Sequence, residues 1–126
     1  MILGARGGVQ IISRHQIEEV HAHVFNTRNT ETGEKYVNRG VVLAKVMVPS
    51  GPVWVMGTHL NSAAKYAGIR ARQAAEITKW IDERVKKGKF DISRDDDIVI
   101  LAGDMNVRMK TDGEGACTRG MGWVLS

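Results

Sequence analysis

The sequence is poor in cysteine, proline and aromatic residues. Its 126 residues contain one cysteine, Cys117, two prolines and only 6% aromatic residues. A single cysteine excludes an intrachain disulfide and a metal cluster built from cysteines alone. No apolar run approaches the ~18 residues that a membrane-spanning helix needs. The first residues also lack the apolar core and the cleavage pattern of a signal peptide, so neither a leader nor a membrane span is visible and the compartment stays open.

The overall composition is that of a soluble globular chain of at most one domain. Hydrophobic residues make up 43% and charged residues 25%, which excludes an intrinsically disordered chain. The net charge is +4, from 18 basic and 14 acidic residues. Such a balance suits an anionic partner such as phosphate, nucleic acid or a lipid headgroup surface, but ordinary soluble proteins often carry it too.

Hydrophobic patterning predicts five strands and one long helix. The apolar positions Ala74, Ile77, Ile81 and Val85 recur every three to four residues, with Trp80 beside them, which indicates an amphipathic helix ending near residue 88. Polar side chains of this helix, Arg70 and Glu76 among them, are expected off the apolar stripe. The strands are expected at residues 9–13, 20–25, 40–48, 53–60 and 98–102.

The expected strands form an α/β chain. The turn 49–52 joins two strands that are apolar on both faces, which predicts an antiparallel hairpin inside a covered sheet. The continuous apolar run 98–102 is typical of a buried strand. Residues 20–25 alternate, so His21 and His23 are expected on a solvated face rather than at a metal site. The polar stretch 26–38 is expected to be a long surface loop of the kind that often has a function.

Two polar clusters follow buried strands. One is the segment 57–61, Gly-Thr-His-Leu-Asn, and the other is 103–106, Gly-Asp-Met-Asn. Strand ends at one edge of a sheet are where α/β folds place ligand chemistry. Asp104 can orient a water or hold a hard cation, and His59 can donate to phosphoryl oxygens or transfer a proton. Taken singly, each cluster is more often an ordinary turn or cap, and it is their pairing that points to phosphate transfer.

These motifs, taken together, resemble the endonuclease/exonuclease/phosphatase superfamily, which includes deoxyribonuclease I and neutral sphingomyelinases. The resemblance rests on 57–60, on Arg70 and Gln73 at the start of the helix, and on Ile-Val-Ile-Leu-Ala-Gly-Asp-Met-Asn-Val at 98–107. The segment 8–19, the residues 38–42 and the Met in Gly-Asp-Met-Asn are similar to bacterial, magnesium-dependent neutral sphingomyelinases. The resemblance therefore implies part of a four-layered α/β sandwich of the deoxyribonuclease I type.

The resemblance also implies roles for individual residues. His59, Asp104 and Asn106 match the catalytic residues of the family, and Asp104 lies near its metal, Mg²⁺ or another divalent cation. Arg39 matches, more loosely, an arginine that contacts phosphate, and Asn61 is a further candidate substrate contact beside His59. Arg70 and Gln73 are expected to tie the helix to the hairpin. The implied reaction is attack of water on a phosphodiester, which for a choline phospholipid at a membrane surface gives ceramide and phosphocholine from sphingomyelin.

Part of the family pattern is absent from this sequence. The family carries an Asn and a metal-binding Glu upstream of these motifs and an Asp-His pair downstream, and Glu18 and Glu19 do not replace the upstream Glu. We therefore expect residues 1–126 to form a partial domain, incomplete at both ends, with the resemblance strongest over 7–107 and a divergent tail at 108–126. The remainder of the domain is then a possible partner. The alternatives are a nuclease of the same superfamily and a catalytically dead remnant that binds phosphate or lipid.

Overall fold

The computed structural model describes residues 2–5, 8–31, 38–93 and 95–107. Cys117, Trp123 and the tail that we expect to diverge lie outside these residues. The elements, in chain order, are β1 (Ile2–Ala5), β2 (Val9–Ile12), β3 (Gln16–Val24), β4 (Gly40–Val48), β5 (Gly51–His59), the short helix η2 (Ala64–Tyr66), α1 (Ala67–Lys86) and β6 (Ile98–Asp104).

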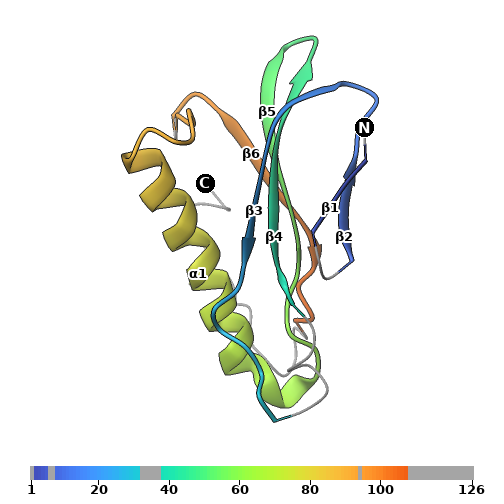
Figure 1. The fold of residues 1–126 in the computed structure, drawn as a ribbon, viewed down its shortest axis with the longest axis vertical. Coiled ribbons are helices and arrows are strands. Elements are labelled where there is room, and N and C mark those ends of the chain that lie inside the picture. The colour runs from blue at the N-terminus through green and yellow to red at the C-terminus, as the bar shows by residue number, and fades with distance from the viewer. Residues whose placement is uncertain (1, 6–7, 32–37, 94, 108–126) are drawn as a thin grey trace.

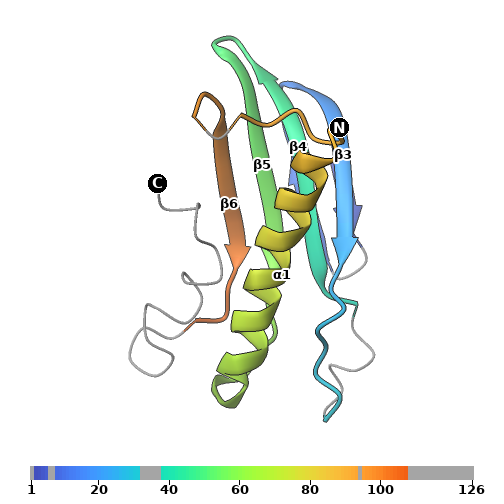
Figure 2. The ribbon, with the colours of Figure 1, turned by 90° about the vertical axis from the view of Figure 1, so that its left-hand side faces the viewer.

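Three layers make up the described part of the molecule. The central layer is a four-stranded sheet in the order β3-β4-β5-β6. Helix α1 covers one face of this sheet, and the antiparallel pair β1-β2 lies on the other face (Figure 1). A view from the helix side shows α1 running along the sheet (Figure 2). This arrangement confirms an α/β fold.

The expected hairpin and crossover are both present. β4 and β5 pair antiparallel from Val48 with Gly51 to Val41 with Thr58, and they are the two inner strands of the sheet. β5 and β6 run parallel, which requires the crossover that α1 provides. The sequence pattern missed β1 and placed the start of β3 four residues too late.

Side chains on both faces of the sheet form cores. The larger core lies between the sheet and α1, and Trp54, Leu43 and Ile77 are 1% exposed or less within it. The smaller core lies under β1-β2 and contains Val42, Ala44, Val46, Ile11 and Ile17. The inner strands are therefore covered on both sides, which explains why residues 40–48 are apolar without alternation.

The exposure of the outer strands differs from our expectation. His21 and His23 face the helix, where His21 packs on Phe90 and His23 stacks on Trp80 with ring centroids 5.5 Å apart. The expectation that they are solvated was wrong because alternation defines two faces without indicating which one α1 covers.

β6 is an edge strand in the described part of the chain, not a strand buried on both faces. Ile98 is 60% exposed and Ile100 is 46% exposed, whereas Val99 and Leu101 pack into the helix-side core. β1-β2 contacts the sheet mainly at β4 and β5, and the outward side chains of β6 stay exposed. Among the described residues, no helix combines the length and the apolar character needed to cross a membrane.

Candidate active site

The parallel pairing of β5 and β6 brings the two polar clusters together. His59 and Asp104 are partners in the register of these strands, at their carboxyl ends. The distance from His59 Nε2 to Asp104 Oδ2 is 3.7 Å, and the two side chains are 39% and 65% exposed. An imidazole and a carboxylate thus lie side by side at an open edge of the sheet, within reach of a ligand.

The turn after β6 fixes the direction of Asp104. Asp104 Oδ1 accepts a hydrogen bond from the Asn106 amide at 2.9 Å, an Asx turn. Asn106 has φ +50°, which asparagine tolerates better than most residues. Its Nδ2 donates to the Leu60 carbonyl at 2.8 Å, and the Leu60 amide donates to the Asp104 carbonyl at 2.9 Å. The ends of the two strands are therefore bonded to one another in both directions.

β5 and β6 approach each other so closely at Gly103 that no side chain fits there. The φ of Gly103 is +145°, and a Cβ at this position would overlap the carbonyl group of Thr58. We expect Gly103→Ala to lower the free energy of unfolding by about 2–3 kcal/mol and to separate Asp104 from His59.

Urea unfolding followed by circular dichroism measures this effect. The matched control is Gly68→Ala, because a Cβ on Gly68 in α1 would meet only the Arg72 side chain at 3.8 Å. This control should raise stability by up to about 1 kcal/mol. Equal effects of the two substitutions would contradict the steric explanation.

Arg39 and Asn61 lie beside this edge, in different environments. Arg39 is half-buried, and its Nη1 donates to the His59 carbonyl at 3.3 Å. Asn61 is 1% exposed, and its Nδ2 donates to the Ser62 carbonyl at 2.8 Å. Both line a small, partly open pocket of about 10 Å³, together with Asn29. The structure therefore pairs His59 with Asp104 and links Arg39 and Asn106 to the same edge through the carbonyls of His59 and Leu60. The expectation that Asn61 contacts the substrate does not fit its burial, because its side chain is bonded to Ser62.

A groove leads along the sheet to His59 and Asp104. Its volume is about 470 Å³, and it is lined by β2 and by the carboxyl ends of β5 and β6. Val9 and Ile11 contribute apolar surface, and His59 and Asp104 contribute the charged and polar groups. A mostly apolar groove that ends in polar groups is the usual form of a binding site for a small molecule.

The residues at this edge suit a magnesium ion that takes one ligand from the protein and its remaining ligands from water or phosphate. Mg²⁺ is commonly held by one or two carboxylates and completed by waters and phosphate oxygens. Asp104 offers an exposed carboxylate of this kind. Within the described ranges, no three His, Cys, Asp or Glu residues cluster in a way that could hold a metal. Glu18 and Glu19 are bonded to Lys45, well along the strands from His59.

Arg70 and Gln73 tie the helix to the segment that follows His59, directly after the hairpin to which we expected them to attach. Arg70 is 1% exposed, and its guanidinium donates to the carbonyls of Asn61 and Ala64 at 3.3 Å and also to that of Ala63. Gln73 Oε1 accepts from the Asn61 amide at 2.9 Å. The expectation that Arg70 lies off the buried face was wrong, because backbone carbonyls satisfy its charge inside the protein.

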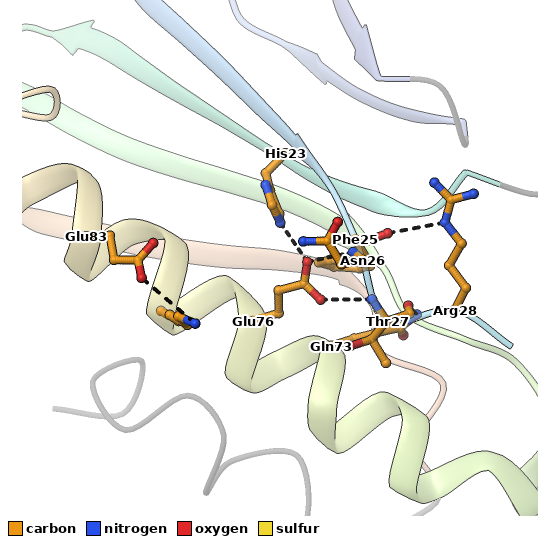
Figure 3. Close-up of polar contacts among 9 residues, drawn as sticks. His23, Phe25, Asn26, Thr27, Arg28, Gln73, Glu76 and Glu83 are labelled. Carbon is orange, nitrogen blue, oxygen red and sulfur yellow. Dashed lines mark hydrogen bonds and ion pairs between the residues drawn. The ribbon is translucent and has the colours of Figure 1, made fainter.

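Sequence reasoning missed Glu76 and its partner His23. Glu76 Oε1 lies 2.7 Å from His23 Nε2, and the carboxylate also accepts from the amides of Asn26 and Thr27 (Figure 3). Its side chain is only 14% exposed, contrary to the expected polar face. A signal was present in the sequence: Arg70, Gln73 and Glu76 are spaced by three residues and so share one side of a helix.

The environment of Glu76 lowers its pKa. Burial disfavours the charged form, but the amides of Asn26 and Thr27 and the His23 ring together hold the pKa of Glu76 below its usual range. A lowered pKa in the folded state stabilises the protein above the unfolded pKa, about 4.3, and this contribution is lost as the pH falls through the folded value.

We therefore expect Glu76→Gln to cost about 1–3 kcal/mol of unfolding free energy at pH 7. The difference from the unmodified protein should shrink as the pH falls below the unfolded pKa, about 4.3, toward the lowered pKa of the folded state. Urea unfolding at several pH values measures both quantities. A difference that stays constant down to pH 3 would contradict the role of the ionised carboxylate.

Comparison with known proteins identifies similar sequences. The profile of endonuclease/exonuclease/phosphatase family 2 matches residues 5–119. Sphingomyelinase C of Listeria ivanovii is 31% identical over 112 residues, which is 84% of this chain and 31% of that protein. The chain therefore spans about a third of the length of this relative.

Solved structures show the same fold. Sphingomyelinase C from Streptomyces griseocarneus has a TM-score of 0.76 at 27% identity, covering 91% of this chain and 38% of that one. A beta toxin variant from Staphylococcus aureus, solved with bound magnesium ions, has a TM-score of 0.73 at 29% identity, covering 91% and 39%. The described architecture thus corresponds to part of these larger folds.

Proposed function

The chain belongs to endonuclease/exonuclease/phosphatase family 2, and from this premise we propose that it carries part of the active site of a phosphodiester hydrolase of the sphingomyelinase C type. The observation that carries the proposal is the pairing of His59 with Asp104 at the ends of two parallel strands, 3.7 Å apart between Nε2 and Oδ2. The similarity to sphingomyelinase C supports the choice of substrate, sphingomyelin, with ceramide and phosphocholine as products.

Each residue has a role in this proposal that its surroundings permit. Asp104, directed by the Asn106 amide, orients the attacking water or holds a divalent cation. His59 donates a hydrogen bond to a phosphoryl oxygen or transfers a proton. Asn106 uses one Nδ2 hydrogen for Leu60 and keeps a second for the phosphate. Arg39 neutralises phosphate charge beside His59, and Asn61 lines the same small pocket as Arg39.

A magnesium ion bound by Asp104 would neutralise the charge that develops on the phosphoryl group. A bound magnesium ion in the beta toxin structure supports this choice of cation. The protein's own groups supply the remaining requirements, which are to orient the water and to hold the phosphate oxygens.

An assay with two substrates tests the proposal. The purified protein is incubated with sphingomyelin vesicles or with plasmid DNA, each with magnesium and with excess chelator. Because the chain carries only part of the family's catalytic set, we expect slow release of phosphocholine that requires magnesium, and no nicking of the plasmid. Nicking without phosphocholine release would favour the nuclease alternative, and hydrolysis of neither substrate would favour a remnant that only binds.

A further inference from the structure

Glu76 forms an anchor for the turn that follows β3. Its carboxylate accepts from the Asn26 amide at 2.7 Å and from the Thr27 amide at 3.1 Å, the two residues directly after Phe25. Figure 3 shows the Glu76 side chain reaching from α1 to this turn, with His23 at the same carboxylate oxygen as the Asn26 amide. Two backbone donors on one half-buried carboxylate form a strong, directional attachment.

His23 holds the Glu76 carboxylate in this orientation. Its Nε2 lies 2.7 Å from Glu76 Oε1, and its ring stacks on Trp80 at an interplanar angle of 23°. Trp80 is 8% exposed and belongs to the helix-side core. The position of the carboxylate is therefore set by a packed aromatic residue rather than by solvent.

The anchored turn is connected to Arg39 through the backbone. The Phe25 amide donates to the Arg39 carbonyl at 2.9 Å, one residue before the amides that Glu76 binds. From the same turn, the Thr27 carbonyl accepts from Gln73 Nε2 at 3.3 Å, and Gln73 also holds Asn61. The Arg39 guanidinium then donates to the His59 carbonyl at 3.3 Å. A continuous set of contacts thus runs from Glu76 to the edge where His59 and Asp104 lie.

We propose that Glu76 is a positioning residue, which fixes the turn 25–27 and thereby directs the Arg39 guanidinium to the substrate phosphate beside His59. This inference rests on the proposed function, because it takes Arg39 as a phosphate contact. Glu76 itself touches no substrate: it acts only through the turn and Arg39. The alternative is that Glu76 only links α1 to the end of β3. Breaking that link would then leave the orientation of Arg39 unchanged.

Glu76→Gln is the variant that tests this proposal. The amide side chain keeps one acceptor oxygen but turns an NH₂ group toward a backbone donor, so one of the two bonds is lost. Glu83→Gln is the matched control, with the same change of charge two turns along the helix. Glu83 is 54% exposed and lies 3.9 Å from Lys79 (Figure 3). Glu76→Asp, which keeps the charge and withdraws the carboxylate by one methylene group, serves if Glu76→Gln does not fold.

The first readout is NMR of the protein without ligand. In Glu76→Gln we expect faster hydrogen exchange of the Asn26 and Thr27 amides, by about tenfold, with unchanged protection in β4 and β5. The Arg39 Nε resonance should shift, and it should remain in place in Glu83→Gln. An Arg39 resonance that does not move while the turn amides are released would overturn the positioning role.

The second readout is a double-mutant cycle with inorganic phosphate as the probe. We expect Glu76→Gln to weaken phosphate binding about tenfold and Arg39→Ala to weaken it at least as much. The double variant should bind no more weakly than Arg39→Ala alone, because Glu76 acts through Arg39. Additive losses would overturn the proposal. Absence of phosphate binding to the unmodified protein would instead contradict the proposed function, whereas the Arg39 resonance would still decide the positioning role.

Discussion

Asp104→Asn is expected to lower the rate of phosphodiester hydrolysis by the protein at least about 100-fold. The asparagine can still accept from the Asn106 amide, so the turn after β6 should persist. What disappears is the negative charge that holds a cation or orients the attacking water. Because this charge acts on the reacting groups, the loss should appear in kcat more than in KM.

A steady-state assay of phosphocholine release, with Asp95→Asn as the control, measures this loss. Asp95 is an exposed residue before β6, and its replacement changes the net charge in the same way. It should leave the rate unchanged. If Asp104→Asn and Asp95→Asn gave the same rate, the assignment of Asp104 to the site would be wrong.

His59→Ala should cause a loss similar to that of Asp104→Asn, and the double variant should be little worse than either alone. Residues that act as a unit on one reacting group give losses that do not add. His59 and Asp104 lie 3.7 Å apart across paired strands, close enough for such coupling. An unchanged rate in His59→Ala would contradict the site.

Arg70→Met is expected to cause the largest loss of stability, about 3 kcal/mol or more of unfolding free energy. The substitution keeps much of the aliphatic volume but removes the donors for the carbonyls of Asn61, Ala63 and Ala64. The buried Asn61 carbonyl, left without this donor, costs about 1–3 kcal/mol, and the Ala64 carbonyl loses its bond as well, whereas the Ala63 carbonyl keeps the Tyr66 amide. The segment after His59 should loosen as a consequence, because these carbonyls connect it to α1.

Arg72→Met is the control for this substitution. Arg72 lies two residues along the same helix and is exposed, so its replacement should change the free energy of unfolding by less than about 0.5 kcal/mol. Urea unfolding of the two variants gives the comparison directly. Similar losses in both would show that charge removal, rather than buried hydrogen bonding, explains the effect of Arg70.

Much of the fold was predictable because its strongest signals are local. Residues 40–48 and 53–60 are apolar on both faces, and they form the inner hairpin of the sheet. The stripe from Ala74 to Val85 lies within α1, and its members contact the helix-side core. These patterns depend on periodicity within one segment, and that periodicity can be read directly from the sequence.

Exposure was predicted less well, because it depends on neighbours that are distant in the sequence. Alternation in β3 separated Val20 and Val24 from His21 and His23 correctly, but α1 covers the face that carries the histidines. Val20 and Val24 are instead 38% and 41% exposed. Burial of Arg70 was unexpected for a different reason: its carbonyl partners are near in the sequence, in the turn before the helix, and helical periodicity does not describe that turn.

The same distinction between local pattern and tertiary packing applies to the candidate site. The sequence by itself determined that His59, Asp104 and Asn106 follow two strands and that Arg70 and Gln73 open the helix between them. Only the tertiary structure decided that the two strands are parallel neighbours, which sets the 3.7 Å separation of His59 and Asp104. It also joined His23 to Glu76 across 53 residues. Periodicity is a property of one segment, whereas distances between side chains depend on how separate segments pack, and no single segment records that packing.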